Sequence, residues 1–267
     1  MGTRRDFYWK GGVVGHEGDP TYPANWYDRV AEAAWAVEPG QAPETYDDYL
    51  LFDTTYNGTD VPEYAPALAG WSGTFKHVEA YLTTYLVQGV TGVMVAGMTA
   101  ETVDIANGIM SGGTVTGTAA FSGDGPAWGI MMGGTVTGAA TFEYGAQFLG
   151  GTCGSAVIDC SGALAPMDQG PGTVVGDLTL IGYLYATIAG TFDVGGNAFI
   201  DEILDVPAWS VAVAAIGQIR IERSSVTNQA IFETPLLTVD KGCSFPTGLD
   251  SNGVIQFLGT ASANDCS

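Results

Sequence analysis

A near-duplicate stretch in the middle of the chain limits the folds that it can adopt. Residues 108–121 read GIMSGGTVTGTAAF and residues 129–142 read GIMMGGTVTGAATF, with eleven of fourteen positions identical. Weaker copies follow at residues 172–180 and 186–194. A unit of about twenty residues is too short to close a hydrophobic core of its own, so copies are expected to stack on one another.

Side chains within each copy alternate between polar and apolar, as in a strand with one buried face. This pattern places Thr114 outside and Val115 and Phe121 inside. Gly117 and Gly138 recur at the same offset and are expected at corners, where the backbone needs positive φ or close approach. The sequence therefore predicts an all-β protein, a parallel β-solenoid (β-helix) in which each strand pairs with its equivalents in the neighbouring copies.

The composition favours the same fold class. Glycine accounts for 39 of 267 residues, 46% of residues are hydrophobic and only 14% are charged, which favours a folded chain of strands and tight turns. A glycine-rich β-sandwich with two similar hairpins is the alternative. We favour the solenoid because both faces of the repeat carry Thr, Ser, Ala and Gly, whereas a sandwich shows clearly charged polar faces and frequent turns.

Three segments are predicted along the chain. Residues 1–69 are aromatic-rich and irregular and are expected to form an N-terminal arm and cap, with one helix over residues 27–37, where alanine is frequent. Residues 70–230 are predicted to be the solenoid body, and residues 231–267 a short C-terminal cap. Apolar side chains in the body exceed what a narrow interior holds, so the sequence favours a homotrimer that buries the remainder.

The charge of the chain excludes several classes of partner. There are 29 acidic and 8 basic residues, the formal net charge is -21, and no Lys or Arg lies between Lys76 and Arg220. Nucleic acid and anionic membrane surfaces are therefore not expected as partners. Self-repulsion that favours solubility explains the acidity; uptake of cations between subunits is the alternative. No secretory signal and no transmembrane segment is predicted, since the longest weakly apolar run is Val206–Ile219.

Four cysteines fit neither a zinc motif nor a dense disulfide framework. They are Cys153, Cys160, Cys243 and Cys266. Buried thiols are the prediction, and pairing of Cys153 with Cys160 or of Cys243 with Cys266 is the alternative.

No catalytic residue, metal ligand or cofactor is predicted. The chain has no nucleophile elbow, phosphate loop or zinc helix, and its histidines are His16 and His77 alone. Two weaker patterns are a glycosidase site of carboxylates beside an aromatic platform and a calcium site, and solvated acidic loops are the alternative. The first would use Asp201, Glu202, Asp205 and Trp209, and the second Asp47, Asp48 and Asp53.

The N-terminal third resembles a known group of proteins. The segments YWKGG, DPTYPANWYDRV and DDYLLFD are similar to the opening of β-helical repeat proteins of bacterial surfaces and bacteriophages. Residues 72–97 resemble the segment that follows it in uncharacterised phage proteins, so the likeness covers roughly residues 7–100. This chain differs by an insertion over residues 30–41.

The resemblance implies a virion component that is assembled in the host cytoplasm. We expect a non-enzymatic capsid decoration or cement protein whose partners are its own copies and the major capsid protein or another virion protein. A short host-recognition spike that binds surface polysaccharide, with or without glycan cleavage, is the alternative. The predicted shell anchor combines basic and aromatic side chains, a composition typical of interfaces, and a frayed terminus packed on the cap is its alternative. The anchor residues are Arg4, Arg5, Phe7, Tyr8, Trp9 and Lys10.

Overall fold

The structure is a computed structural model of the chain. It describes residues 2–40, 46–53, 66–81, 92–123, 128–161, 167–182, 186–188, 191–201, 209–213, 217–222, 230–233, 236–240 and 254–258. This part of the chain is built from β-strands and one turn of 3-10 helix, η1 (Pro23–Asn25), and contains no α-helix. The residues divide into two compact units, Met1–Gly138 and Ala139–Ser267.

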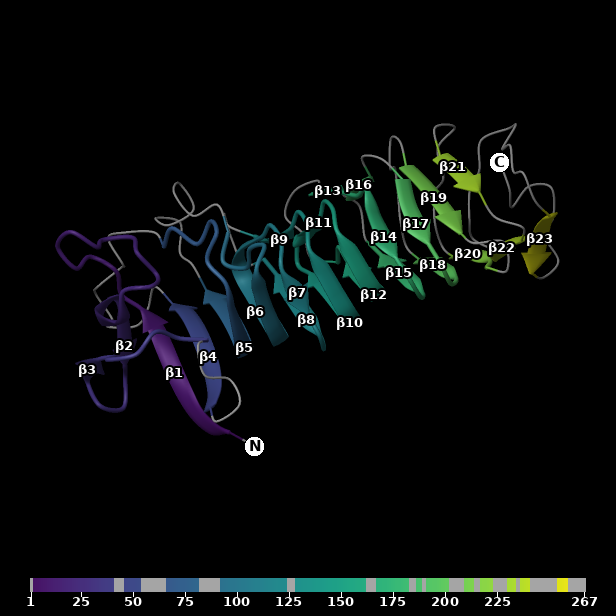
Figure 1. Ribbon diagram of the computed structural model, residues 1–267. Helices are drawn as coiled ribbons and strands as arrows, with labels where there is room; N and C mark the ends of the chain where they lie inside the picture. The colour runs from purple at the N-terminus through teal and green to yellow at the C-terminus, as the bar shows by residue number, and fades with distance from the viewer. Residues whose placement is uncertain are drawn as a thin grey trace. The chain divides into compact units, whose positions relative to one another are not determined.

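The first unit contains parallel strands that succeed one another along the chain (Figure 1). Its strands are β1 (Thr3–Trp9), β2 (Trp26–Asp28), β3 (Ala33–Ala34), β4 (Tyr46–Asp53), β5 (Gly73–Tyr81), β6 (Met98–Met110), β7 (Thr114–Val115), β8 (Ala119–Ser122), β9 (Gly129–Met131) and the start of β10 (Thr135–Glu143). β1 pairs with β4, β4 with β5 and β5 with β6, all in parallel. The long strand β6 then pairs in parallel with β7, β8 and β9 in turn.

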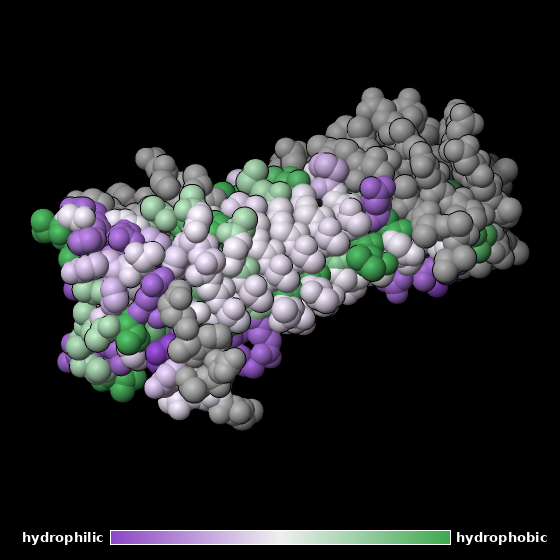
Figure 2. Space-filling view, in the orientation of Figure 1, coloured by the Kyte–Doolittle hydropathy of each residue, from purple (hydrophilic) through white to green (hydrophobic). Residues whose placement is uncertain are grey.

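The sequence repeat coincides with the strand register. Gly108 pairs with Gly129 and Thr114 with Thr135, so these strands of the first copy lie in register beside their counterparts in the second. The threonine ladder extends to Thr99, which pairs with both Thr114 and Thr74. Figure 2 shows the visible surface over β6–β10 in colours between hydrophilic and hydrophobic, as expected for a wall of Thr, Ser, Ala and Gly.

Parallel pairing also builds the second unit. Its strands are the end of β10, β11 (Gln147–Phe148), β12 (Thr152–Asp159), β13 (Met167–Gln169), β14 (Gly172–Val174), β15 (Leu178–Ile181), β16 (Ala186–Ile188), β17 (Thr191–Val194), β18 (Ala198–Asp201), β19 (Trp209–Val213), β20 (Ile219–Glu222), β21 (Ala230–Glu233), β22 (Leu236–Asp240) and β23 (Val254–Leu258). One series of parallel pairs runs β12, β14, β17, β19, β21, and another runs β12, β15, β18, β20, β22, β23. β13 and β16 form a separate parallel pair.

Apolar ladders form the interior of the second unit. Ile158, Leu180, Ile200 and Ile221 occupy equivalent positions on successive strands, and each is at most 2% exposed. Polar side chains hold the adjoining turns together, because Asp177 accepts a hydrogen bond from the amide of Asn197. Such in-register stacks of like residues let each copy of the repeat bury its apolar face against the next.

The predicted all-β class, with a mostly parallel sheet, is confirmed. Strands β1 and β4 show that the described part of residues 1–69 is more regular than predicted. The predicted corner glycines work by close approach. A Cβ atom on Gly117 would lie 2.6 Å from the carbonyl oxygen of Glu101, and one on Gly138 would lie 2.4 Å from that of Gly117. Neither glycine is among those with positive φ. A side chain is excluded here by the backbone of the preceding strand.

The predicted helix over residues 27–37 is wrong. This segment forms a hairpin of β2 and β3, in which Asp28 pairs with Ala33. The carboxylate of Asp28 accepts hydrogen bonds from the amides of Val30 and Ala31, which closes a turn, and Glu32 adopts a φ of 51°. The alanines of this segment are exposed, so a helix here would bury no apolar face that could outweigh these local interactions.

Candidate functional site

Strand β1 buries two of the six predicted anchor residues. Phe7 is 0% and Trp9 is 2% exposed. The ring of Phe7 stacks on Trp35 with centroids 4.5 Å apart, and Trp9 meets Trp26 edge-on at 4.9 Å. These aromatic side chains belong to the core of the first unit.

Arg5 is held inside the fold by a bidentate ion pair. Its Nε and Nη2 atoms donate to the two carboxylate oxygens of Asp48, each at 2.6 Å, and the side chain of Asp48 is fully buried. Asp48 also accepts a hydrogen bond from the amide of Gly40, and the guanidinium of Arg5 lies 3.9 Å from the ring centre of Tyr46. Because Arg5 and Asp48 are paired positions on β1 and β4, this contact joins the two strands.

Three further residues of the predicted anchor reach the surface. Arg4 and Lys10 are exposed and Tyr8 is half-buried. Three cations in this region each lie near an aromatic ring centre: Arg4 over Tyr49 at 4.1 Å, Lys10 over Tyr27 at 5.7 Å and Arg29 over Tyr8 at 5.5 Å. We call Arg4, Tyr8, Lys10, Tyr27 and Arg29 the basic-aromatic face. This face is where the first unit could meet an acidic partner, since a cation above a ring presents both charge and apolar area.

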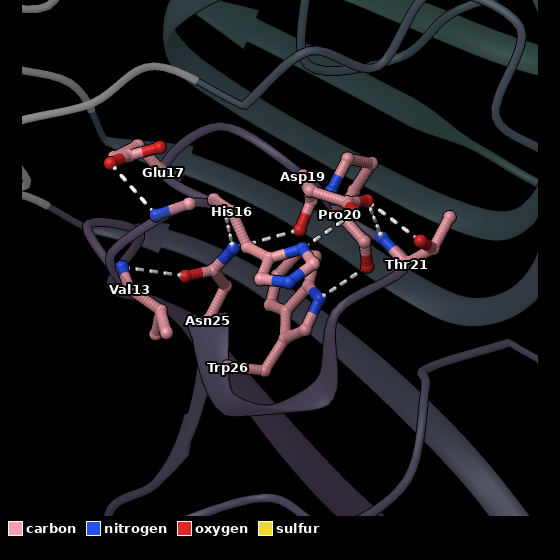
Figure 3. A network of polar contacts seen from close by, with 9 residues as sticks. Val13, His16, Glu17, Asp19, Pro20, Thr21, Asn25 and Trp26 are labelled. Carbon is pink, nitrogen blue, oxygen red and sulfur yellow. Dashed lines mark hydrogen bonds and ion pairs between the residues drawn. The ribbon is translucent and has the colours of Figure 1, made fainter.

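One buried asparagine organises the loop that follows β1 (Figure 3). The side chain of Asn25 is completely buried, and its Oδ1 atom accepts a hydrogen bond from the amide of Val13. Its Nδ2 atom donates to the carbonyl oxygens of His16 and Asp19, and the next residue, Trp26, donates from Nε1 to Pro20. Sequence reasoning missed the role of Asn25, for which the run of proline and aromatic residues around it was the sole signal.

The outer side of this loop carries a second cluster of polar and aromatic side chains. The ring of His16 stacks on Tyr22 with centroids 4.0 Å apart, and its Nδ1 atom lies 3.5 Å from Asp19. Asp19 accepts hydrogen bonds from the hydroxyl and the amide of Thr21, and these lower the pKa of its carboxyl. The carboxylate of Asp19 is therefore fixed in position and ionised near neutral pH.

An open pocket of about 490 Å³ lies beside this loop. Three segments of the first unit line it: Asp19, Pro20 and Thr21 from the loop, Glu38, and Ala67, Ala69, Gly70, Trp71 and Ser72. The indole Nε1 of Trp71 donates to Glu38 at 2.9 Å. Because Trp71 and Pro20 are themselves buried, the pocket presents mainly carboxylates and hydroxyls. Sequence reasoning missed it because its walls come from separate segments.

A third polar cluster lies on the outer face of β5 and β6. The Nδ1 atom of His77 and the hydroxyl of Thr102 share a hydrogen bond of 2.8 Å. The Nε2 atom of His77 lies 3.8 Å from the carboxylate of Glu79. Glu79 is paired in register with Asp104 on the next strand. The polar contact with His77 lowers the pKa of Glu79, whereas partial desolvation and the charge of Glu79 raise the pKa of Asp104.

The weaker predicted sites are only partly described. Asp201 is 7% exposed, Glu202 and Asp205 lie outside the described residues, and the side chain of Trp209 is not described. Of the predicted calcium ligands, Asp48 is engaged by Arg5, and the side chain of Asp53 is not described. No group of three or more His, Cys, Asp or Glu side chains suited to a metal ion occurs among the residues that the structure describes.

Two of the four cysteines can be placed. Cys153 and Cys160 are buried thiols that are not joined in a disulfide, as predicted, and burial raises the pKa of each to about 12. Cys243 and Cys266 lie outside the described residues. Thiols with so high a pKa carry almost no thiolate at neutral pH, so these two are poor nucleophiles.

Within the described part of the chain, no helix has the length and apolar character needed to cross a bilayer. Comparison of the chain with protein-family models, with curated proteins and with solved structures finds no match.

Proposed function

We propose that this chain forms a parallel β-solenoid and serves as a non-enzymatic structural protein of a bacteriophage virion, where it decorates or cements the capsid. The observation that carries the proposal is the register of the repeat, in which Thr74, Thr99, Thr114 and Thr135 stack on consecutive strands. Repetition of this kind produces a stiff element with a uniform wall rather than a cleft for chemistry.

The surface of the repeat supports a structural role. Its outward positions are mostly Thr, Ser, Ala and Gly, and the longest stretch without Lys or Arg runs from Lys76 to Arg220. A wall that carries no cation has little affinity for polyanions, and its acidity keeps neighbouring copies in solution until they assemble. This is the behaviour expected of a component present in many copies on one particle.

The basic-aromatic face is the proposed contact with the shell. Arg4 and Lys10 supply charge there, and Tyr8 and Tyr27 supply the aromatic area that interfaces favour. We propose that an acidic surface of the major capsid protein, or of another virion protein, receives this face in a homotrimer. Arg5, Phe7 and Trp9, from the same predicted anchor, hold β1 in place beneath it.

Copy number per particle tests the proposal. Purified virions would be digested and the peptides of this chain quantified by mass spectrometry against those of the major capsid protein. Hundreds of copies are expected. A few copies per particle would instead indicate a host-recognition spike, and a particle without the protein would overturn the virion assignment.

The contact itself has a separate test. Charge reversal of Arg4→Glu with Lys10→Glu should weaken binding to shells that lack the protein, measured by co-sedimentation. The matched control is Arg220→Glu, an exposed arginine of the second unit, which should bind as the unaltered protein does. Equal binding by the double variant would show that the basic-aromatic face is not the contact.

A further inference from the structure

We propose that two neighbouring columns of threonine side chains in the first unit bind the surface of ice. The columns lie on consecutive parallel strands, and we call their members the threonine array. The array consists of Thr74, Thr99, Thr114 and Thr135 in one column and, two residues further along the chain, Thr116 and Thr137 in the other. The proposal goes beyond the virion assignment and is independent of it, because it rests on this surface alone.

The strand register gives the array a regular spacing in two directions. Neighbouring strands of a sheet lie about 4.7–4.9 Å apart, and residues two positions apart on one strand lie about 6.6–6.8 Å apart. The amide of Thr116 donates to the carbonyl oxygen of Ala100, and that of Gly138 donates to Gly117, so the pairing continues through the second column. The oxygen lattice of hexagonal ice repeats at closely similar intervals along two perpendicular directions. Hydroxyls of the array can therefore occupy successive positions of that lattice.

The array is held in place by the core beneath it. Ala100, Val115 and Val136, which alternate with the threonines, are each 0% exposed. The branched Cβ of threonine restricts χ1, and the hydroxyl of Thr116 lies 3.4 Å from the carbonyl oxygen of Ala100. An array that is already ordered loses little entropy when it meets a solid surface. Many weak contacts that form together then produce a stable attachment.

The side chains of the array are open to solvent and suited to water. Four of the six threonines are exposed, and Thr99 and Thr114 are half-buried. Each hydroxyl can donate one hydrogen bond and accept two, so it can replace a water molecule at the surface of a hydrogen-bonded lattice. The methyl group beside each hydroxyl offers apolar area that is removed from liquid water when the ice surface approaches.

Charge narrows the class of partner. The chain has a formal net charge of -21, yet the array carries none. Lys76 and Glu101 border the array on β5 and β6, where they pair with each other beside an open depression of about 230 Å³. An uncharged surface does not attract ions or polyelectrolytes. A polysaccharide would stack on aromatic rings, and no position of the array carries one. The neutral and periodic surface of ice matches both the charge and the spacing.

Inhibition of ice recrystallisation by the full chain tests the proposal. A thin frozen film of the purified protein would be annealed just below its melting point, and the growth of ice grains followed by microscopy. We expect slower grain growth than in a film that contains an albumin at the same concentration. Grain growth at the same rate in both films would overturn the proposal.

Two pairs of substitutions locate the binding surface. Thr116→Tyr with Thr137→Tyr places large rings over the second column and should abolish the inhibition. The matched control is Val14→Tyr with Val30→Tyr, at two β-branched positions outside the array that are each 91% exposed, and it should retain the inhibition. Circular dichroism and sedimentation show whether each variant keeps the fold and the oligomeric state of the unaltered protein.

A smaller change covers the case in which paired rings disturb the sheet. Thr137→Lys introduces a single charge at an exposed position and should also weaken the inhibition. Full inhibition by both array variants would place ice binding elsewhere and overturn the proposal. A change of oligomeric state in the folded tyrosine variant would instead show that the array is an interface between copies of the chain, which also overturns it.

Discussion

The amide of Gly138 donates a hydrogen bond of 2.9 Å to the carbonyl oxygen of Gly117, so the same position in two copies of the repeat is joined across strands. A methyl group on Gly138 would lie 2.4 Å from that oxygen. The two copies can therefore approach only while this position lacks a side chain. The conspicuous glycines of the repeat serve the contact between strands.

Gly138→Ala should destabilise the protein by about 1–3 kcal/mol, the usual cost of forcing an extra methyl group into a packed site. Urea unfolding followed by circular dichroism measures the change. Thr137→Val, an exposed neighbour on β10, is the control and should stay within about 0.5 kcal/mol of the unaltered protein. If the two variants had equal free energies of unfolding, the backbone around Gly138 would be able to accommodate a methyl group without loss of stability.

Asp48→Asn should cost about 3–5 kcal/mol, because it leaves the guanidinium of Arg5 with little solvent and no counter-charge. The double variant Arg5→Met with Asp48→Leu should recover much of this loss, since it removes both charges. Arg4→Met is the control: Arg4 pairs with Asp6 at the surface, with 60% of its side chain exposed, and such pairs contribute about 0.2–1 kcal/mol. A loss no larger for Asp48→Asn than for Arg4→Met would contradict the structural role of this pair.

Asn25→Ala should loosen the loop between β1 and β2. It removes the acceptor for the amide of Val13 and the donor to two carbonyl oxygens, and unsatisfied buried groups cost about 1–3 kcal/mol. Faster hydrogen exchange over residues 11–25 is the expected result. Asn25→Asp should not restore protection, because a carboxylate cannot donate to the carbonyl oxygens of His16 and Asp19. Full protection in Asn25→Asp would show that the acceptor alone holds the loop.

Asp104→Asn should change how stability depends on pH. The pKa of Asp104 is raised above its ordinary value of 3.8 in the folded state, by desolvation first and by the charge of Glu79 second. A carboxyl whose pKa is higher in the folded state than in the unfolded state stabilises the fold while it is protonated. This contribution is fully present below the pKa of the unfolded state, and it is lost as the pH rises through the pKa of the folded state. The variant should therefore gain in melting temperature over the unaltered protein only as the pH rises above about 4.

The contribution of Glu79 to the raised pKa of Asp104 can be separated from that of desolvation. In a Glu79→Gln background the gain from Asp104→Asn should be smaller, because the charge that contributes to the raised pKa is absent. Melting temperatures at pH 3 and pH 7 for the four proteins complete the cycle. A gain from Asp104→Asn that is the same at both pH values would show that desolvation and Glu79 do not act on this carboxyl.

Much of the strand arrangement could be predicted from local pattern. The alternation around Val115 and Phe121 predicted which side chains face inward, and both are buried. The helix over residues 27–37 failed because alanine propensity is a weak preference, which the turn at Asp28 and the contact of Trp35 with Phe7 override. The predicted anchor combined residues from both sides of a strand, because the alternation of β1 puts Arg5, Phe7 and Trp9 on its inner side.

The sequence by itself indicated the all-β class and the in-register pairing of the repeat, because short copies with a pattern of period two can bury their apolar faces together by stacking. Tertiary structure decided which side chains remain available for binding. The Arg5–Asp48 pair, the bonds of Asn25 and the pocket beside Trp71 join segments that are distant along the chain. Their contacts depend on how the turns bring strands and loops together, which no local spacing encodes.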